Sequence, residues 1–160
     1  MSGSLIFCWV GKTAAEYAKC AEREYLGRIG RYCDARVLTV AEERHDGTYS
    51  PAHRMEREGR KILDKLSGVE PACVIVLDPA AKQMRSRDFA ERVRAEAYDA
   101  GRNVVFVVGG PDGISSLVRQ RADWLLGLSE MTLPHDLARV VLLEQAYRAL
   151  TIINGHPYDR

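Results

Sequence analysis

Two short loops between residues 103 and 135 carry residue types that are well suited to binding a ligand. The first is GGPDG at 109–113, which follows the apolar run VVFVV at 104–108. Adjacent glycines let the backbone turn sharply and let a ligand approach without a Cβ in the way. The second is SEMTLPH at 129–135, which follows the apolar run 124–128. Either loop alone is also typical of an ordinary turn, but together the two predict a cleft.

Short apolar runs along the chain supply the strands that would position these loops. A continuous β-branched run such as the one at 104–108 is typical of a strand buried on both faces, central in a parallel sheet. Open α/β sheets bind ligands at the carboxyl ends of such strands. The expected strands are residues 5–10, 35–40, 72–78, 104–108 and 124–128.

The segments between these runs have the periodicity and capping residues of helices. Thr13 can cap a helix after the first strand, and Ser115 or Ser116 can cap a short helix that runs to about Arg121. Residues 54–66 predict an amphipathic helix with its charges outward. The alternation of strands and helices predicts one α/β domain over residues 1–160, a parallel sheet with helices on both faces.

Residues 82–94 combine a predicted helix with an excess of positive charge. Against Asp88 and Glu91, the stretch holds five basic residues: Lys82, Arg85, Arg87, Arg92 and Arg94. One interpretation is the solvated face of a helix that Gly101 ends. The other is a patch that contacts phosphate groups.

Composition limits the possible classes of function. Hydrophobic residues make up 46% and charged residues 28% of the chain, as in soluble globular proteins. No apolar run approaches the roughly 18 residues that cross a bilayer, and the first residues lack a signal-peptide pattern. We therefore expect a cytoplasmic protein with no membrane partner. Because the net charge is only +1, any affinity for RNA must come from local basic patches, a dimer or a preformed ribosomal surface.

The cysteines and histidines show no pattern of a metal site. The four cysteines are Cys8, Cys20, Cys33 and Cys73. They form no CxxC pair and have no histidine at metal-ligand spacing, so we expect buried structural thiols and no metal. His45 and His53 lie in the polar loop 41–53 and are more typical of solvated side chains than of ligands. No GxGxxG follows the first strand, which disfavours a dinucleotide-binding redox domain.

Residues 135–151 predict a last helix that is apolar nearly all round. Between Leu137 and Leu150 the strongly polar residues are Arg139, Glu144, Gln145 and Arg148. A helix of this kind must be covered on more than one side. A chain of 160 residues can hardly provide that cover alone, so we predict a homodimer packed through this helix.

Three blocks in the last third of the chain resemble the signature blocks of the RlmH family. They are VVGGPDGIS at 107–115, LSEMTLPHDLARVVLLEQAYRAL at 128–150 and NGHPYDR at 154–160. Weaker similarity extends upstream, in WVGKT at 9–13, EGRKILDKL at 58–66 and VLDPAAK at 76–82. Members of this family are small SPOUT-class methyltransferases that act on a pseudouridine of large-subunit ribosomal RNA. The resemblance implies a SPOUT-type parallel-sheet fold with a C-terminal trefoil knot.

The resemblance also implies S-adenosyl-L-methionine as the cofactor, bound between the two loops. Adenine needs apolar walls and backbone hydrogen-bond partners, which residues 128–134 could supply. The ribose and methionine portions would approach the two adjacent glycines, with the end of the third strand closing the other side. The predicted cofactor-binding residues are Leu77, Asp78, Gly109, Gly110, Leu128, Ser129, Glu130, Met131, Thr132, Leu133 and Pro134.

The reaction that this family catalyses is attack by N3 of a pseudouridine on the sulfonium methyl group. The donor is already activated, so the protein mainly positions the two partners. The family pattern suggests His156 and Tyr158 as catalytic residues, and Tyr158 could instead stack on the flipped base. Arg139, Arg148 and Arg160 could hold phosphates or orient the base, or could form ion pairs on the surface or in a dimer interface. Asp159 departs from the family pattern and removes one basic contact from the tail.

Two alternatives share the expected fold. One is a methyltransferase that acts on another RNA, such as a transfer RNA. The other is a catalytically silent protein that binds RNA or the ribosome. An intact loop at 129–134 disfavours the silent protein, since such a protein would be free to lose it.

Overall fold

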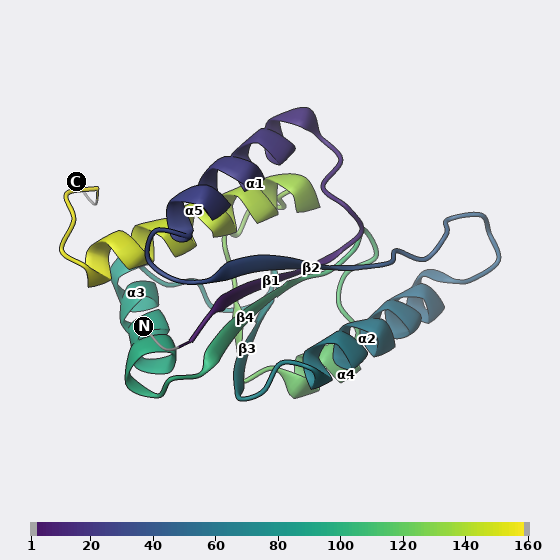
Figure 1. The fold of residues 1–160 in the computed structure, drawn as a ribbon. Helices are drawn as coiled ribbons and strands as arrows, with labels where there is room; N and C mark the ends of the chain where they lie inside the picture. The colour runs from purple at the N-terminus through teal and green to yellow at the C-terminus, as the bar shows by residue number, and fades with distance from the viewer. Residues whose placement is uncertain (1–2, 159–160) are drawn as a thin grey trace.

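The computed structural model describes residues 3–158 and contains a five-stranded sheet in which every paired strand is parallel (Figure 1). The strand order is β2-β1-β4-β3-β5. The strands are β1 (Leu5–Val10), β2 (Ala35–Val40), β3 (Ala72–Leu77), β4 (Asn103–Val108) and β5 (Trp124–Leu126). β4 is the middle strand, as its uninterrupted apolar run predicted, and the parallel α/β architecture is confirmed.

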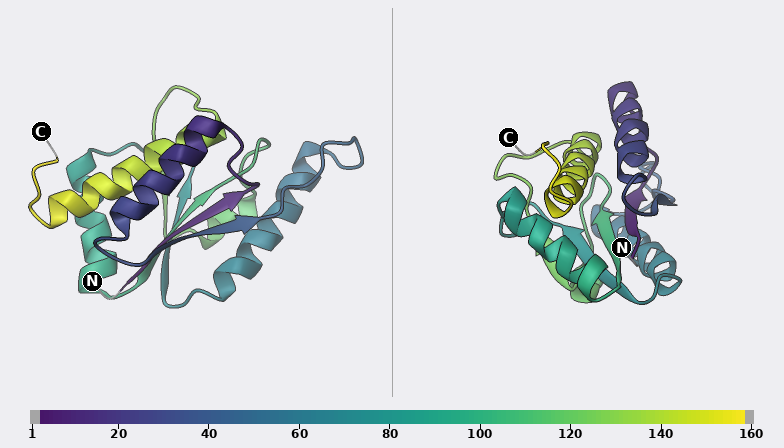
Figure 2. Two further views of the ribbon diagram at one scale, coloured as in Figure 1. Left: turned by 45° about the horizontal axis from the view of Figure 1, so that its top comes forward. Right: turned by 60° about the vertical axis from the view of Figure 1, so that its left-hand side comes forward.

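Helices cover both faces of the sheet. They are α1 (Glu16–Ile29), α2 (Pro51–Ser67), α3 (Ser86–Arg94), α4 (Ser116–Arg121) and α5 (His135–Ile153), with a π-helical turn, η1 (Ala95–Asp99), after α3. Figure 1 shows α1 and α5 on one face and α2 and α4 on the other, and α3 packs beside α5 (Figure 2). None of the helices within residues 3–158 has the length and apolar character needed to cross a membrane.

Each face of the sheet has its own hydrophobic core. On the side of α1, α3 and α5, the rings of Phe7 and Phe106 stack with their centroids 5.4 Å apart, and Phe89 from α3 packs against them. On the other side, Ile62 and Leu66 of α2 cover the strands. Because both faces are covered in this way, every residue of β1 and β3 is buried.

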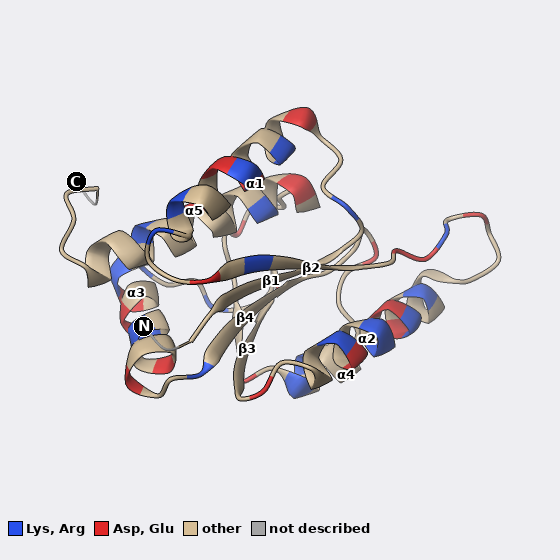
Figure 3. Ribbon diagram, viewed as in Figure 1, with Lys and Arg blue, Asp and Glu red and all other residues tan. Residues whose placement is uncertain are grey.

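α2 begins earlier than its hydrophobic spacing predicted, at Pro51 rather than at Arg54. Ser50 caps the helix, and its hydroxyl oxygen accepts a hydrogen bond from the backbone N–H of His53 at 3.3 Å. Proline at the first helical position is compatible with this start. Blue and red segments alternate along α2 in Figure 3, and most of these charged residues are exposed, as expected. Two charged residues of the helix, Arg54 and Glu58, are nevertheless buried.

Two other predicted boundaries differ from the structure. Thr13 does not cap α1, because the helix begins after Ala15 and the Thr13 hydroxyl donates to Glu22 at 2.5 Å. β5 ends at Leu126 rather than at residue 128. The backbone N–H of Gly127 turns to the carbonyl of Lys82, 3.2 Å away, so the chain leaves the sheet two residues early.

α5 is covered largely by its own chain. It packs between α1 and α3 and over β4, which buries Leu142, Leu143 and Leu150 completely. The largest exposed apolar side chain on the helix is Leu137, at 36%. The apolar character of α5 therefore follows from packing within one chain, and the predicted homodimer must be argued on other grounds.

The cysteines lie partly where they were expected. Cys8 and Cys73 are buried in strands, and burial raises the pKa of the Cys8 thiol to about 12 and that of Cys73 to about 11. Cys33 is half-buried, whereas Cys20 is exposed on α1, so the prediction of a buried thiol is wrong at Cys20.

The trefoil knot stays a prediction from the resemblance.

Candidate cofactor pocket

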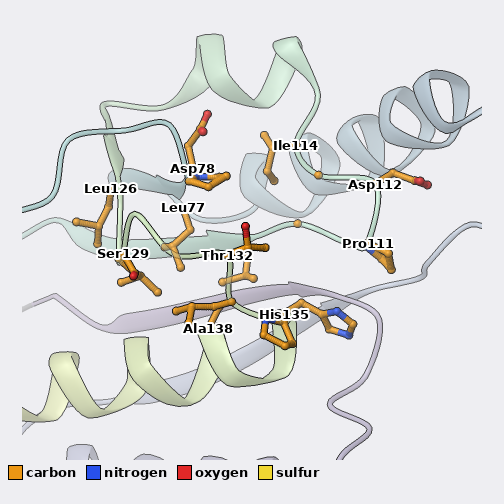
Figure 4. Close-up of a pocket in the computed structure, with 18 of the residues that line it drawn as sticks. Leu77, Asp78, Pro111, Asp112, Ile114, Leu126, Ser129, Thr132, His135 and Ala138 are labelled. Atoms are coloured by element: carbon orange, nitrogen blue, oxygen red, sulfur yellow. The ribbon is translucent and has the colours of Figure 1, made fainter.

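A cavity of about 760 Å³ opens at the carboxyl ends of β3, β4 and β5. Its volume is within the usual range for sites that bind small molecules. Figure 4 shows the side chains of Leu77, Leu126, Ser129 and Thr132 gathered together, with His135 at the start of α5 beside them. Three loops, one after each strand, meet here together with the first turn of α5. This is the cleft that the two loops of the sequence predicted.

Ten of the eleven residues predicted to bind the cofactor line this cavity, and their role in binding it stays a prediction. They are Leu77, Asp78, Gly109, Gly110, Leu128, Ser129, Met131, Thr132, Leu133 and Pro134. Glu130 does not line it and is exposed. His135 and Arg119 line the cavity without having been predicted.

The glycine loop after β4 forms a tight turn. The N–H of Gly113 donates to the carbonyl of Gly110 at 3.0 Å, and Gly113 has a φ of +100°, in the left-handed region that glycine tolerates. A Cβ at Gly109 would lie 2.6 Å from the Gly113 carbonyl oxygen, and one at Gly110 would lie 3.0 Å from a carboxylate oxygen of Glu58. The sharp turn that was expected of these glycines is present, and the packing of the loop also requires them.

Asp112 ties the glycine loop to α2. Its carboxylate accepts two hydrogen bonds from Arg54, at 2.7 Å and 3.1 Å, and Arg54 also donates to the carbonyl of Tyr49 at 2.6 Å. The Arg54 guanidinium holds the pKa of Asp112 below its usual range. In Figure 4 the Asp112 side chain points away from the cavity. Asp112 therefore acts as an anchor for the loop.

Asp78 has a similar role in the loop after β3. It is buried at 6% exposure, and its carboxylate accepts from the N–H of Ala80 at 2.9 Å and from Arg119 Nε at 2.7 Å. Sequence reasoning missed Arg119. A buried aspartate after a strand needs a partner, and an arginine on the following helices was the signal that could have identified it.

The loop after β5 offers unpaired backbone groups to the cavity. Gly127 and Leu126 bond to neighbouring loops, but from 128 to 133 the one backbone hydrogen bond within residues 3–158 is from Met131 N–H to Ser129 Oγ, at 3.0 Å. Exposed backbone donors and acceptors beside the apolar side chains of Leu128 and Leu133 suit a planar heterocycle with polar edges.

His135 stands at the mouth of the cavity, as the first residue of α5. Its side chain is 41% exposed, and Nε2 lies 3.8 Å from a carboxylate oxygen of Asp136. Asp136 is buried, and it accepts from the N–H groups of Ala14 and Ala15 at 3.1 and 2.8 Å, which joins the start of α1 to the start of α5.

The predicted catalytic residues lie at the opposite end of α5. His156 Nδ1 is 2.6 Å from the hydroxyl of Tyr32, and the hydroxyl of Tyr158 donates to Glu144 at 3.2 Å. The Tyr158 ring packs edge-on against Tyr147 with centroids 4.8 Å apart. Burial raises the pKa of the Tyr158 phenol to about 12, so it remains protonated at neutral pH.

Within one chain the tail and the cavity are far apart. The 19 residues of α5 separate them, a helix length of roughly 28 Å at about 1.5 Å per residue. Figure 1 shows the C-terminal segment leaving the far end of α5. The structure therefore does not bring His156 or Tyr158 together with the cavity of the same chain.

The three arginines predicted to contact RNA differ in position. Arg139 is 1% exposed and donates to the Val10 carbonyl at 2.6 Å, so its guanidinium faces the interior and not the solvent. Arg148 is half-buried, pairs with Glu144 at 2.6 Å and lies over the Tyr158 ring. Arg160 lies outside the described residues, as does Asp159.

Comparison with known proteins gives matches over nearly the whole chain. A family model described as predicted SPOUT methyltransferase matches residues 4–159. The ribosomal RNA large subunit methyltransferase H of Anaeromyxobacter sp. (strain Fw109-5) is 43% identical over 152 residues, which cover 94% of this chain and 95% of the relative. The protein of the same name from Clostridium kluyveri is 37% identical over 154 residues, covering 94% and 96%.

Solved structures share the fold at low sequence identity. A probable methyltransferase from Bordetella pertussis Tohama I superposes with a TM-score of 0.58 and 13% identity, covering 93% of this chain and 95% of that one. The TrmH/SpoU tRNA modifying enzyme of A. aeolicus superposes with a TM-score of 0.54 and 13% identity, covering 97% and 78%. At this identity the likeness concerns the fold alone.

Proposed function

The chain belongs to the RlmH family of SPOUT methyltransferases, and from this premise we propose that it methylates N3 of a pseudouridine in large-subunit ribosomal RNA. The methyl donor is S-adenosyl-L-methionine, and the enzyme works on the ribosome, in the cytoplasm, as a homodimer. The observation that carries the proposal is the cavity at residues 77–78, 109–114 and 128–135, together with relatives named for ribosomal RNA methylation.

The residues of the cavity fit this donor. The apolar side chains of Leu77, Leu128 and Leu133 offer walls for adenine, and the unpaired backbone groups of 128–133 offer partners for its polar edge. The backbone of Gly109 and Gly110 borders the same space and leaves room for the ribose and methionine portions. When bound, the donor supplies a methyl group that is already activated for transfer.

The protein itself must then position the acceptor base and accept the proton that leaves its nitrogen. The acceptor nitrogen must lose its proton before or during the attack, and His156 is the candidate base. Because the phenol of Tyr158 stays protonated, its role is to donate a hydrogen bond or to stack on the base, not to remove a proton.

A second copy of the chain is needed to complete this site. Roughly 28 Å of helix separate the cavity from the tail, so the tail that serves a cavity must come from another chain. An antiparallel pairing of two α5 helices would put each tail beside the partner's cavity. The exposed apolar side chains of Tyr17 and Leu137, near the starts of α1 and α5, support a contact on this side of the molecule. Arg148 would then lie near the bound RNA, and Arg160 stays a predicted RNA contact outside the described residues.

The experiment uses ribosomes from cells that lack this gene. They are incubated with the purified protein and radiolabelled S-adenosyl-L-methionine, and the labelled nucleotide is mapped by mass spectrometry. Methyl on a large-subunit pseudouridine is the expected result. Cofactor binding without incorporation into ribosomes would overturn the ribosomal target and favour another RNA such as a transfer RNA. Calorimetric titration with S-adenosylhomocysteine that releases no heat would favour a silent RNA-binding or ribosome-associated protein.

A further inference from the structure

A strip of exposed basic side chains begins at the rim of the cavity. We call the five residues Lys82, Arg85, Arg87, Arg92 and Arg94 the basic strip, and all five are exposed. The strip follows the loop after β3 and then the outer side of α3. None of these five residues has a role in the proposed methyl transfer. Together they give residues 82–94 a local excess of positive charge.

The start of the strip is held at a fixed place beside the cavity. The carbonyl of Lys82 accepts from the N–H of Gly127 at 3.2 Å, and Gly127 precedes the loop that lines the cavity. A Cβ at Gly127 would lie 2.2 Å from the carbonyl oxygen of Ala81, so the two loops touch closely here. Asp78, on the cavity wall, accepts from Ala80 in the same loop. Lys82 is thus connected to the cavity through short backbone contacts.

The rest of the strip is held by α3. The hydroxyl of Ser86, at the start of α3, donates to Gln145 of α5 at 2.7 Å. Phe89 and Val93 are buried on the inner side, which turns Arg92 and Arg94 outward. Arg92 lies over the Trp124 ring at 4.8 Å, a contact that positions the guanidinium and leaves its outer N–H groups to other partners.

The charges of the strip are mostly not neutralised by the protein. Within residues 3–158, Lys82, Arg85, Arg92 and Arg94 form no ion pair. The cations of α2 differ, because Arg54, Arg57 and Lys61 are paired with Asp112 and Glu43.

Asp88 and Glu91 share the outer side of α3 and lower the local potential. Five basic side chains against these two carboxylates still leave an excess of positive charge along the helix.

We propose that the basic strip is a docking surface for the phosphate backbone of the RNA segment next to the acceptor nucleotide. The proposal rests on the proposed function, since it assumes that an RNA base enters the cavity. A molecule with a net charge of only +1 gains little from long-range attraction, so phosphate contacts must be local. Exposed arginine and lysine side chains on a strip that starts beside the cavity are the groups that make such contacts.

The test compares two matched double variants of the full-length protein. Lys82→Gln/Arg85→Gln removes two charges of the strip that make no ion pair within residues 3–158. Arg60→Gln/Lys65→Gln removes two charges that are equally exposed and equally without an ion pair in that range, from α2 on the opposite face of the sheet. Affinity for large ribosomal subunits is measured across a series of salt concentrations, with calorimetric titration of S-adenosylhomocysteine as the check on the cavity.

The strip variant is expected to bind ribosomal subunits about ten-fold or more weakly, at unchanged affinity for S-adenosylhomocysteine. The slope of log affinity against log salt should fall by about 1.4 to 1.8, since each phosphate contact contributes about 0.7 to 0.9. The α2 variant should match the wild type.

A wild-type slope in the strip variant, or an equal loss in both variants, overturns the proposal. Binding is measured apart from methyl transfer, so wild type that binds ribosomal subunits but does not methylate them refutes the proposed function alone. Wild type that does not bind them refutes both.

Discussion

The two ends of α5 belong to regions that are built in different ways. At its start, Pro134, His135 and Ala138 line a cavity whose walls are loops held by part-buried ion pairs and backbone hydrogen bonds. At its far end, the tail lies on aromatic rings from the turn after α1 and from α5, with His156 against Tyr32 and Tyr158 against Tyr147. The first region is complete in one chain as a place for a small molecule. The second has groups that could act on a base but no cavity beside them.

This difference suggests that the two ends have separate functions. One end binds the methyl donor, and the other end contacts the acceptor base at the cavity of the partner chain. Variants at one end should then change donor affinity alone, and variants at the other should change turnover alone.

The largest effect is expected at the glycine loop. Gly109→Ala places a methyl group 2.6 Å from the Gly113 carbonyl oxygen and 2.8 Å from the Ile114 side chain, so the turn must open. We expect a loss of roughly 1–3 kcal/mol in stability from this overpacking. Affinity for S-adenosylhomocysteine should fall at least about a hundred-fold, measured by calorimetry, because a misplacement of about 1 Å can cost that factor.

Gly27→Ala is the matched control for this variant. A Cβ at Gly27, on the exposed side of α1, would have no atom within 4 Å. In a helix this change should add about 0.5–1 kcal/mol of stability and leave donor affinity unchanged. Unaltered donor affinity in Gly109→Ala would mean that the glycine loop does not contact the donor.

The next effect concerns turnover and not donor affinity. Tyr158→Ala removes a ring that packs on Tyr147 at 4.8 Å and under Arg148 at 4.8 Å. We expect methyl transfer to fall by about ten- to a hundred-fold, the usual size of a lost positioning contact. The affinity for S-adenosylhomocysteine should be that of the wild type. A parallel loss of donor affinity would contradict the separation of the two regions.

Co-expression of the two variants tests which chain supplies the tail to each cavity. A heterodimer of Gly109→Ala and Tyr158→Ala chains has one intact cavity, and the intact tail comes from the other chain. If each tail serves the partner's cavity, this heterodimer methylates its substrate although both homodimers are weak. If a tail served its own cavity, the heterodimer would hold no complete site and stay inactive.

Much of the first region could be predicted from the sequence, because its information is local. Apolar runs place the strands, and parallel strands bring their carboxyl ends to one edge, so the loops at 109–113 and 128–134 were expected to meet. The anchors of these loops were not predicted. Asp112 meets Arg54 across 58 positions of sequence, and Asp78 meets Arg119 across 41. No single sequence shows which of many charged residues will pair over such separations.

The second region was harder to predict for two reasons. The place of the tail depends on Tyr32 and Tyr147, whose packing follows from how α1 and α5 cross. Arg139 was predicted to contact RNA because it is charged. It shares a helical face with Leu142, Leu143 and Ala146, and that spacing already indicated a buried position. A charged residue within the apolar stripe of a helix is better interpreted as a buried partner of neighbouring polar groups.

An intermediate loss of donor affinity is expected when the Arg54–Asp112 contact that anchors the glycine loop is removed. Arg54→Ala removes both hydrogen bonds to the Asp112 carboxylate, so the loop should become mobile and donor affinity should fall by about ten-fold. Arg57→Ala, in the next turn of α2, loses a more exposed pair with Glu43 and should change donor affinity little. Equal effects of the two substitutions would show that Asp112 is not a specific anchor.

The ion pair between Arg54 and Asp112 should make the stability of the fold depend on pH. The folded-state pKa of Asp112 is lowered, so the pair stabilises the fold above the unfolded pKa of about 3.9 and loses this effect as pH falls through the folded pKa. The Tm of Arg54→Ala should therefore lie below that of the wild type at pH 7. The gap should close as the pH falls below about 4. A gap that stays constant down to pH 3 would assign the loss to packing and not to charge.

The smallest effect is expected where the tail meets the turn after α1, at Tyr32. Tyr32→Phe removes the hydroxyl that lies 2.6 Å from His156 Nδ1 and keeps the ring. One hydrogen bond contributes about 1 kcal/mol, so turnover should change about five-fold at unchanged donor affinity. The hydroxyl also fixes which ring nitrogen of His156 is free to face the substrate. Tyr49→Phe is the control, because the Tyr49 ring stacks on His53 just before and within the start of α2, away from the tail, and the change should leave turnover as in the wild type. Unchanged turnover in Tyr32→Phe would show that this contact does not serve the reaction, and the base would then be sought elsewhere, with His135 at the cavity mouth as the next residue to substitute.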